Sequence, residues 1–138
     1  MAYAVTDYAK LYAIKPGTGA SIAWADNTYT PDVSSPVTTD SLLFLSTGNG
    51  DVACYNAIKG DTLWTHYFKD PFYASPIIAG DMVYLLDRTG VMHIVKSKSK
   101  FELVAESSLG EATDCTPAFS DKKIYIRGKK NLYCISNN

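Results

Sequence analysis

Short runs of alternating apolar and polar residues cover most of this chain, and none of them follows the period of an α-helix. The alternation is clearest at residues 82–87 ("MVYLLD") and 123–128 ("KIYIRG"), where successive side chains would face opposite sides of a sheet. Turns rich in Gly, Asn and Asp separate the runs, as at residues 48–51 and 59–61. The pattern predicts an all-β protein of short antiparallel strands.

The same pattern returns about every 40 residues. Ser-Pro or Thr-Pro pairs begin three copies, at residues 35–36, 75–76 and 116–117. Trp24 and Trp64 are also 40 residues apart, and 40 further on the equivalent place falls on Val104. A large flat side chain near the end of an outermost strand can lie against the next sheet and cover the junction. This regularity identifies a repeat protein.

Each copy divides into four short strands, and tandem four-stranded units of this length predict a β-propeller, whose units are called blades. The expected units are residues 1–26 (a partial blade of three strands), 34–68 and 74–108 (complete blades), and 115–138 (a partial blade of three strands). The first unit lacks the first strand of the pattern and the last unit lacks the fourth. The predicted fold is therefore a partial β-propeller of about three and a half blades.

A ring of three and a half blades would not close, because natural propellers have about 4 to 8 blades. Three explanations are open: a fragment of a seven- or eight-bladed parent, copies that assemble into one ring, or an open arc with capped ends. Exposed sheet faces and edges favour association. We expect a homodimer or a higher ring that closes a seven- or eight-bladed propeller.

Residues 54–64 ("CYNAIKGDTLW") contain a small residue, then Asn56, then Lys59-Gly60 and a final Trp64. This resembles the tryptophan-docking pattern of the pyrroloquinoline-quinone-type β-propeller repeat. Residues 13–24 are similar, with one extra residue before Trp24, whereas the third copy departs furthest. The resemblance implies a structural, blade-docking role for Trp24, Gly60 and Trp64.

The family includes quinone-dependent alcohol dehydrogenases and the propeller lipoprotein of the outer-membrane β-barrel assembly machinery, so the resemblance implies a periplasmic or extracellular location. The dehydrogenases carry an adjacent Cys-Cys pair at the cofactor, whereas Cys54, Cys115 and Cys134 are far apart in this sequence. We expect these three to be unpaired, buried, apolar residues. His66 and His93 fall in different repeats, and His93 is expected to be structural.

No catalytic, cofactor-binding or metal-ligating set is therefore predicted, and a fragment of a quinone-dependent dehydrogenase is kept as the alternative. A formal net charge of −1 gives no field that would gather nucleic acid or an anionic membrane. No apolar run is as long as a membrane span, and no basic segment followed by an apolar stretch begins the chain. Basic residues near the C-terminal end are interpreted as a solvated strand edge.

Aromatic residues gather in the segments that would link one blade to the next, at residues 25–34 and 66–75. The candidate binding surface contains Tyr29, His66, Tyr67, Phe68, Phe72 and Tyr73, together with Arg88 from a different loop. Such residues suit contact with a protein or a carbohydrate, and the alternative is that they pack as core beneath the loops. The predicted function is a non-enzymatic binding scaffold.

Overall fold

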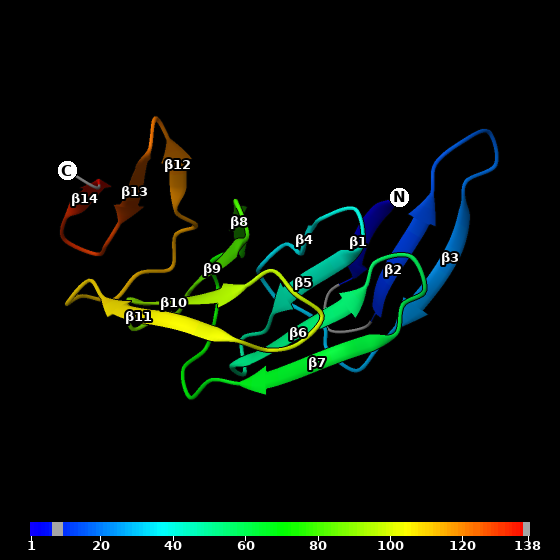
Figure 1. Cartoon of the computed structure of the whole chain (residues 1–138), viewed down its shortest axis with the longest axis horizontal. Helices are drawn as coiled ribbons and strands as arrows, with labels where there is room; N and C mark the ends of the chain where they lie inside the picture. The colour runs from blue at the N-terminus through cyan, green and yellow to red at the C-terminus, as the bar shows by residue number, and fades with distance from the viewer. Residues whose placement is uncertain (7–9, 137–138) are drawn as a thin grey trace.

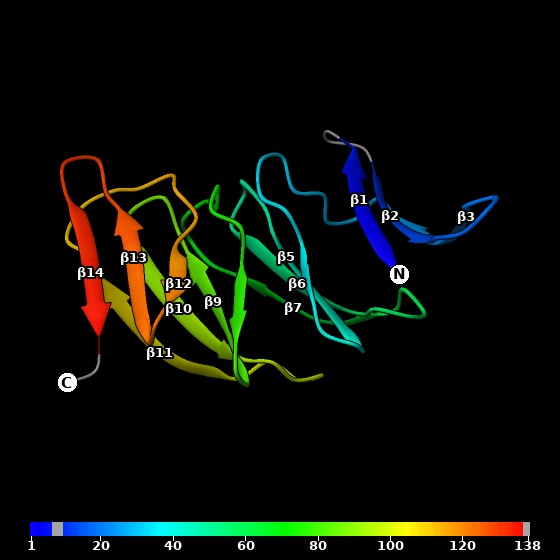
Figure 2. The same cartoon turned by 90° about the horizontal axis from the view of Figure 1, so that it is seen from above.

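The computed structural model describes residues 1–6 and 10–136 of the 138-residue chain. These residues form 14 strands in four antiparallel sheets, and no helix occurs among them (Figure 1). Figure 2 shows the sheets side by side in chain order, with the N-terminal and C-terminal sheets at opposite ends of an open array. The predicted all-β, partial β-propeller is confirmed, and the array is not closed on itself.

The four sheets contain three, four, four and three strands. The first sheet contains β1 (Ala2–Thr6), β2 (Lys10–Lys15) and β3 (Ser21–Asp26). The second contains β4 (Val37–Thr38), β5 (Leu42–Ser46), β6 (Asp51–Asn56) and β7 (Thr62–Tyr67). The third contains β8 (Ile77–Ala79), β9 (Met82–Leu86), β10 (Val91–Lys96) and β11 (Leu103–Ser108). The fourth contains β12 (Ala118–Ser120), β13 (Lys123–Arg127) and β14 (Leu132–Ser136).

In the first three sheets, the register of the last two strands repeats and includes a bulge each time. Cys54 lies opposite Trp64 in the second sheet, and Ile94 lies opposite Ala105 in the third. The expectation that Val104 takes the tryptophan position is therefore wrong by one residue. The β10–β11 connection is one residue longer than the β6–β7 connection, which a fixed spacing of 40 does not include.

Three apolar clusters fill the three junctions between neighbouring sheets. The junction of the second and third sheets is the most aromatic, with Phe44, Trp64, Phe68 and Phe72 packed against Val83 and its neighbours. The two middle sheets thus pack on both faces against their neighbours, and each end sheet packs on one face.

The inner strands are also joined by a series of hydrogen bonds from one sheet to the next. The Ser35 N–H donates to Ser75 Oγ at 2.9 Å, and the Ser75 N–H donates to Thr116 Oγ1 at 2.9 Å. The Ser-Pro and Thr-Pro pairs that mark the repeats therefore also connect the sheets.

Cys54 is buried, and burial raises the pKa of its thiol to about 12. Cys115 and Cys134 are exposed, so the expectation that all three cysteines are buried is wrong for these two. All three thiols are free. In the part of the chain that the structure describes, no helix is long and apolar enough to span a membrane.

Candidate functional site

The connections at one end of the sheets form a continuous surface, which we call the loop face. It combines the links between sheets with the turns between the second and third strands of a blade. The Arg88 N–H donates to the Pro71 carbonyl at 2.9 Å, and the Thr113 N–H donates to the Arg88 carbonyl at 3.2 Å. The turn of the third sheet that contains Arg88 is therefore held between the link that precedes this sheet and the link that follows it.

Arg88, Tyr73 and Asp114 form a cluster on the loop face. The Arg88 guanidinium carbon lies 3.9 Å from the centre of the Tyr73 ring, and Arg88 Nε lies 2.6 Å from Asp114 Oδ1. The hydrogen bond between them raises the pKa of Arg88 and lowers that of Asp114, because each charge favours the other. Both side chains remain more than one-third exposed. The structure thus brings together two predicted residues, Tyr73 and Arg88, and adds Asp114.

Phe68 and Phe72 do not belong to an exposed surface. Phe68 is 6% exposed and Phe72 is fully buried, and both lie in the core between the second and third sheets. Their rings meet edge to face, 5.7 Å apart. The alternative stated for the aromatic links therefore applies to these two residues: they are core.

The remaining predicted residues have other surroundings than the Arg88 cluster. His66 stacks on Phe101 with 4.0 Å between ring centres, so it fills part of the junction between the second and third sheets. Tyr67, at 65% exposed, alternates with His66 along β7 and so faces the other side of the strand. Tyr29 is half-buried against the core between the first and second sheets.

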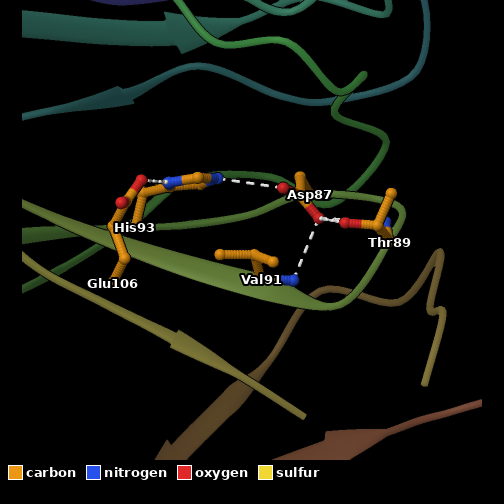
Figure 3. A network of polar contacts seen from close by, with 5 residues as sticks. All are labelled: Asp87, Thr89, Val91, His93 and Glu106. Carbon is orange, nitrogen blue, oxygen red and sulfur yellow. Dashed lines mark hydrogen bonds and ion pairs between the residues drawn. The ribbon is translucent and has the colours of Figure 1, made fainter. Parts of the chain in front are cut away.

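His93 lies at the centre of a polar network beneath the loop face (Figure 3). Its Nε2 is 2.9 Å from Asp87 Oδ2 and its Nδ1 is 2.6 Å from Glu106 Oε1. The other Asp87 oxygen, Oδ1, accepts the Val91 N–H and both the N–H and the hydroxyl of Thr89. An ionised carboxylate only accepts hydrogen bonds, so when both carboxylates are ionised each ring nitrogen of His93 donates one of these bonds.

The pKa of His93 fits this arrangement. Burial works to lower it, but the hydrogen bonds to Asp87 and Glu106 outweigh burial and hold the pKa above its ordinary value. Burial likewise works to raise the pKa of Asp87, and the hydrogen bonds from His93, Val91 and Thr89 together outweigh it, so this pKa is lowered. The centre of the Phe68 ring lies 4.3 Å from that of the imidazole, so His93 also contacts the aromatic core of the junction. The buried side chain of His93 is consistent with a structural role.

Sequence reasoning named His93 but missed its partners. His93 lies opposite Glu106 in the β10–β11 register, and Asp87 precedes the glycine turn that leads into β10. A hairpin alignment that included the bulge would have placed Glu106 beside His93.

The two tryptophans make equivalent contacts with the sheet that follows. Trp24 Nε1 donates to the Ala57 carbonyl at 3.0 Å, and Trp64 Nε1 donates to the Lys98 carbonyl at 2.9 Å. A side chain at Gly60 would meet the Trp24 indole at 2.7 Å, and its φ of +85° also favours glycine.

The protein family described as outer membrane protein assembly factor BamB has a sequence model that matches residues 7–135. This chain belongs to that family. A search of curated proteins found no match. The pyrroloquinoline-quinone-type propeller resemblance stated from the sequence is thereby confirmed.

Solved structures share the fold of this BamB-family chain. The crystal structure of BamB from Moraxella catarrhalis superposes with a TM-score of 0.62 at 17% identity, over 96% of this chain and 42% of that one. A europium-containing methanol dehydrogenase gives 0.61 at 18% identity, over 77% of this chain and 22% of that one. The computationally designed Ika4 protein gives 0.75 at 8% identity, over 99% of this chain and 84% of that one.

The chain spans less than half the length of the Moraxella BamB chain. At these identities the likeness is one of fold, and fold alone does not carry function. Within the described ranges, no group of three His, Cys, Asp or Glu side chains is arranged to hold a metal ion. On the loop face, Tyr73, Arg88 and Asp114 form a cluster whose side chains hold one another in place and whose charged groups stay exposed.

Proposed function

We propose that this BamB-family chain is a non-enzymatic binding module whose loop face holds a protein partner. The observation that carries the proposal is the exposed Arg88 guanidinium, fixed between the Tyr73 ring and the Asp114 carboxylate. Arginine and tyrosine dominate the binding energy of protein interfaces, and a side chain already held in place loses little conformational entropy when a partner binds. A carbohydrate that stacks on Tyr73 is the second ligand class that this surface suits.

The test compares the ligands bound by the immobilised wild-type protein with those bound by an Arg88→Ala variant. Bound proteins are identified by mass spectrometry, and bound glycans are identified on an array. We expect Arg88→Ala to weaken binding of the same ligand by about 2 kcal/mol or more, as for an interface hot spot. Arg127→Ala provides the matched control, because Arg127 is an exposed arginine on β13. Equal binding by wild type and Arg88→Ala, with unchanged circular dichroism, would refute the proposal.

We further propose that the open array self-associates head to tail. On the first sheet, Tyr12 and Ile14 occupy the side that faces away from the second sheet, because their neighbours in β2, Leu11 and Ala13, are buried. On the fourth sheet, Leu132 is 69% exposed. A contact between such apolar faces would repeat the junctions inside the chain and would be heterologous, so it would close into a ring or continue as a filament.

Light scattering coupled to size exclusion measures this directly. We expect a mass at least double the 15.1 kDa of one chain at micromolar concentration. A clean monomer would contradict head-to-tail association.

A quinone-dependent dehydrogenase fragment is the competing function, and its only support is the likeness to methanol dehydrogenase. Addition of pyrroloquinoline quinone and calcium would then produce dye-linked alcohol oxidation. We expect no such activity from this chain.

A further inference from the structure

The junction of the third and fourth sheets contains a groove that arises from a change of side-chain size. On β7 and just after it, Trp64, His66 and Phe68 alternate on the side that faces the third sheet. By register, Ala105 replaces Trp64 on β11, and Ser107 then replaces His66. The backbone is the same in both places while the large aromatic rings are missing from the second.

Leu109 completes this series of replacements. Its N–H donates to the Gly90 carbonyl at 2.9 Å, just as the Phe68 N–H donates to the Gly50 carbonyl at 2.8 Å. Leu109 is therefore the counterpart of Phe68, and it is half-buried where Phe68 is core. Three successive positions that face the next sheet thus carry smaller side chains at this junction.

Two of the three replaced positions, Ser107 and Leu109, line a cavity of about 170 Å³ at this junction. Its wall is mostly apolar, with Tyr84, Ile94 and Leu109 from the third sheet and its outgoing link, and Ile124, Ile126 and Ile135 from the fourth sheet. An apolar cavity of roughly 150 Å³ in a protein interior is large enough to bind benzene. The size and the lining therefore suit one planar aromatic ring system.

A second hollow of about 320 Å³ adjoins this cavity and shares Tyr84, Ile94, Ile124 and Ile135 with it. Its lining contains Lys122 and Lys123 and, among the residues that the structure describes, no Asp or Glu. An aromatic ring in the apolar part could therefore extend an anionic group toward two ammonium groups.

We propose that the groove between the third and fourth sheets binds a small planar aromatic carboxylate, of the size of an indole or phenyl acid. The ring occupies the apolar cavity beside Ser107 and Leu109, and the carboxylate lies near Lys122 and Lys123. This site lies between two sheets and is independent of the Arg88 cluster on the loop face. Loss of one site would leave the other intact.

Isothermal titration calorimetry with four probes tests the proposal: indole-3-acetate, indole, tryptamine and acetate. We expect indole-3-acetate to bind at least tenfold more tightly than tryptamine, which has the same ring and the opposite charge, and acetate to show no binding. No saturable binding of indole-3-acetate, or equal binding of tryptamine, would overturn the proposal.

Two kinds of variant locate the ring and the carboxylate. Ser107→Phe fills the cavity that Ser107 lines and should abolish binding. Ala105→Trp restores the indole of the other junctions two residues earlier on the same side of β11 and is the second blocking variant. Ile58→Trp adds a tryptophan at an exposed position of the turn between β6 and β7 and should leave binding unchanged. The Lys122→Ala, Lys123→Ala double variant should weaken indole-3-acetate at least tenfold and leave indole unaffected.

A second copy of the chain is the other occupant that the test distinguishes. If Ala105→Trp lowers the mass measured by light scattering and wild type binds none of the probes, the groove is an interface between copies and the small-molecule site is refuted. If the blocking variants keep the wild-type circular dichroism and still bind indole-3-acetate, the ligand lies elsewhere and the proposal is likewise wrong.

Discussion

The junction of the second and third sheets and the junction of the third and fourth sheets share one backbone plan but differ in their interiors. At the first, Trp64, Phe68 and Phe72 are buried in an aromatic core. At the second, every residue of β11 is exposed and a groove remains. The comparison teaches that repeated hydrogen bonds position the sheets, while side-chain volume decides whether the space between them becomes core or cavity.

The polar networks of the two junctions differ in a parallel way. In β10, His93 pairs with Asp87 and Glu106 beneath buried rings. In β14, at the equivalent step of the repeat, Tyr133 donates its hydroxyl to Glu111 at 2.7 Å. The first network places a buried imidazole between two carboxylates, whose hydrogen bonds raise its pKa, and the second is a hydrogen bond at a more open site.

The largest expected effect is the difference in lost stability when two equivalent residues, Phe68 and Leu109, are each replaced by Ala. Phe68→Ala removes a buried ring and should lower the free energy of unfolding by about 3–5 kcal/mol. Leu109→Ala removes a half-buried side chain beside the groove and should cost less than about 2 kcal/mol. Urea unfolding followed by circular dichroism measures both. Equal losses would mean that the two junctions are equally well packed, against the comparison.

The next effect depends on pH. His93→Gln leaves Asp87 without its cationic partner and should destabilise the protein by about 2–3 kcal/mol at pH 6, less than a fully buried pair because Glu106 is half exposed. The raised folded-state pKa of His93 sets the sign. Its contribution is complete below pH ~6.5, the ordinary value, and is lost as pH rises through the folded-state pKa.

Thermal unfolding of wild type and His93→Gln between pH 5 and pH 9, in steps of about 0.5 unit, tests this pH dependence. The difference between them should shrink as pH rises. His66→Gln serves as the histidine control, since His66 stacks on Phe101. A His93→Gln penalty that stays constant with pH would contradict a charged imidazole in the folded state.

The smallest expected effect is on acid stability, at Glu111 in the junction of the third and fourth sheets. The hydrogen bond from Tyr133, with further bonds from Lys130 and Asn131, lowers the pKa of Glu111 to about 2. A lowered pKa stabilises the fold above the ordinary value of about 4.3, and this contribution is lost as pH falls toward 2. Glu111→Gln should therefore flatten the acid side of the stability curve, and Glu102→Gln should leave it unchanged. An unaltered acid transition in Glu111→Gln would disprove this role.

The repeat made most of the fold predictable, because turn residues and alternation recur at a near-constant spacing. It failed at the tryptophan position of the third unit, where one extra residue in the connection moves the site from Val104 to Ala105. It also could not separate Tyr73 from Phe72, because the burial of a link residue depends on which neighbouring sheet it meets. Local pattern carries no such information.

The partners of His93 and Arg88 were unpredictable for a similar reason. Glu106 approaches His93 only through a bulged register, and Asp114 approaches Arg88 across two connections of the loop face. Both contacts are non-local, and neither Glu106 nor Asp114 belongs to a sequence motif that would indicate its partner. The cavity between the third and fourth sheets was unpredictable as well, because only the register shows that the small Ser107 takes the place of His66.

The hydrogen bonds of the inner strands give the array a polarity. In each observed step an N–H points forward along the chain order and the next sheet supplies the hydroxyl that receives it, from Ser35 to Ser75 and from Ser75 to Thr116. Two arrays that met through like ends would place donor against donor or acceptor against acceptor, and a desolvated group without a partner is costly. Continuation of the series therefore selects one orientation for any added sheet, the one in which each N–H donor meets a hydroxyl acceptor.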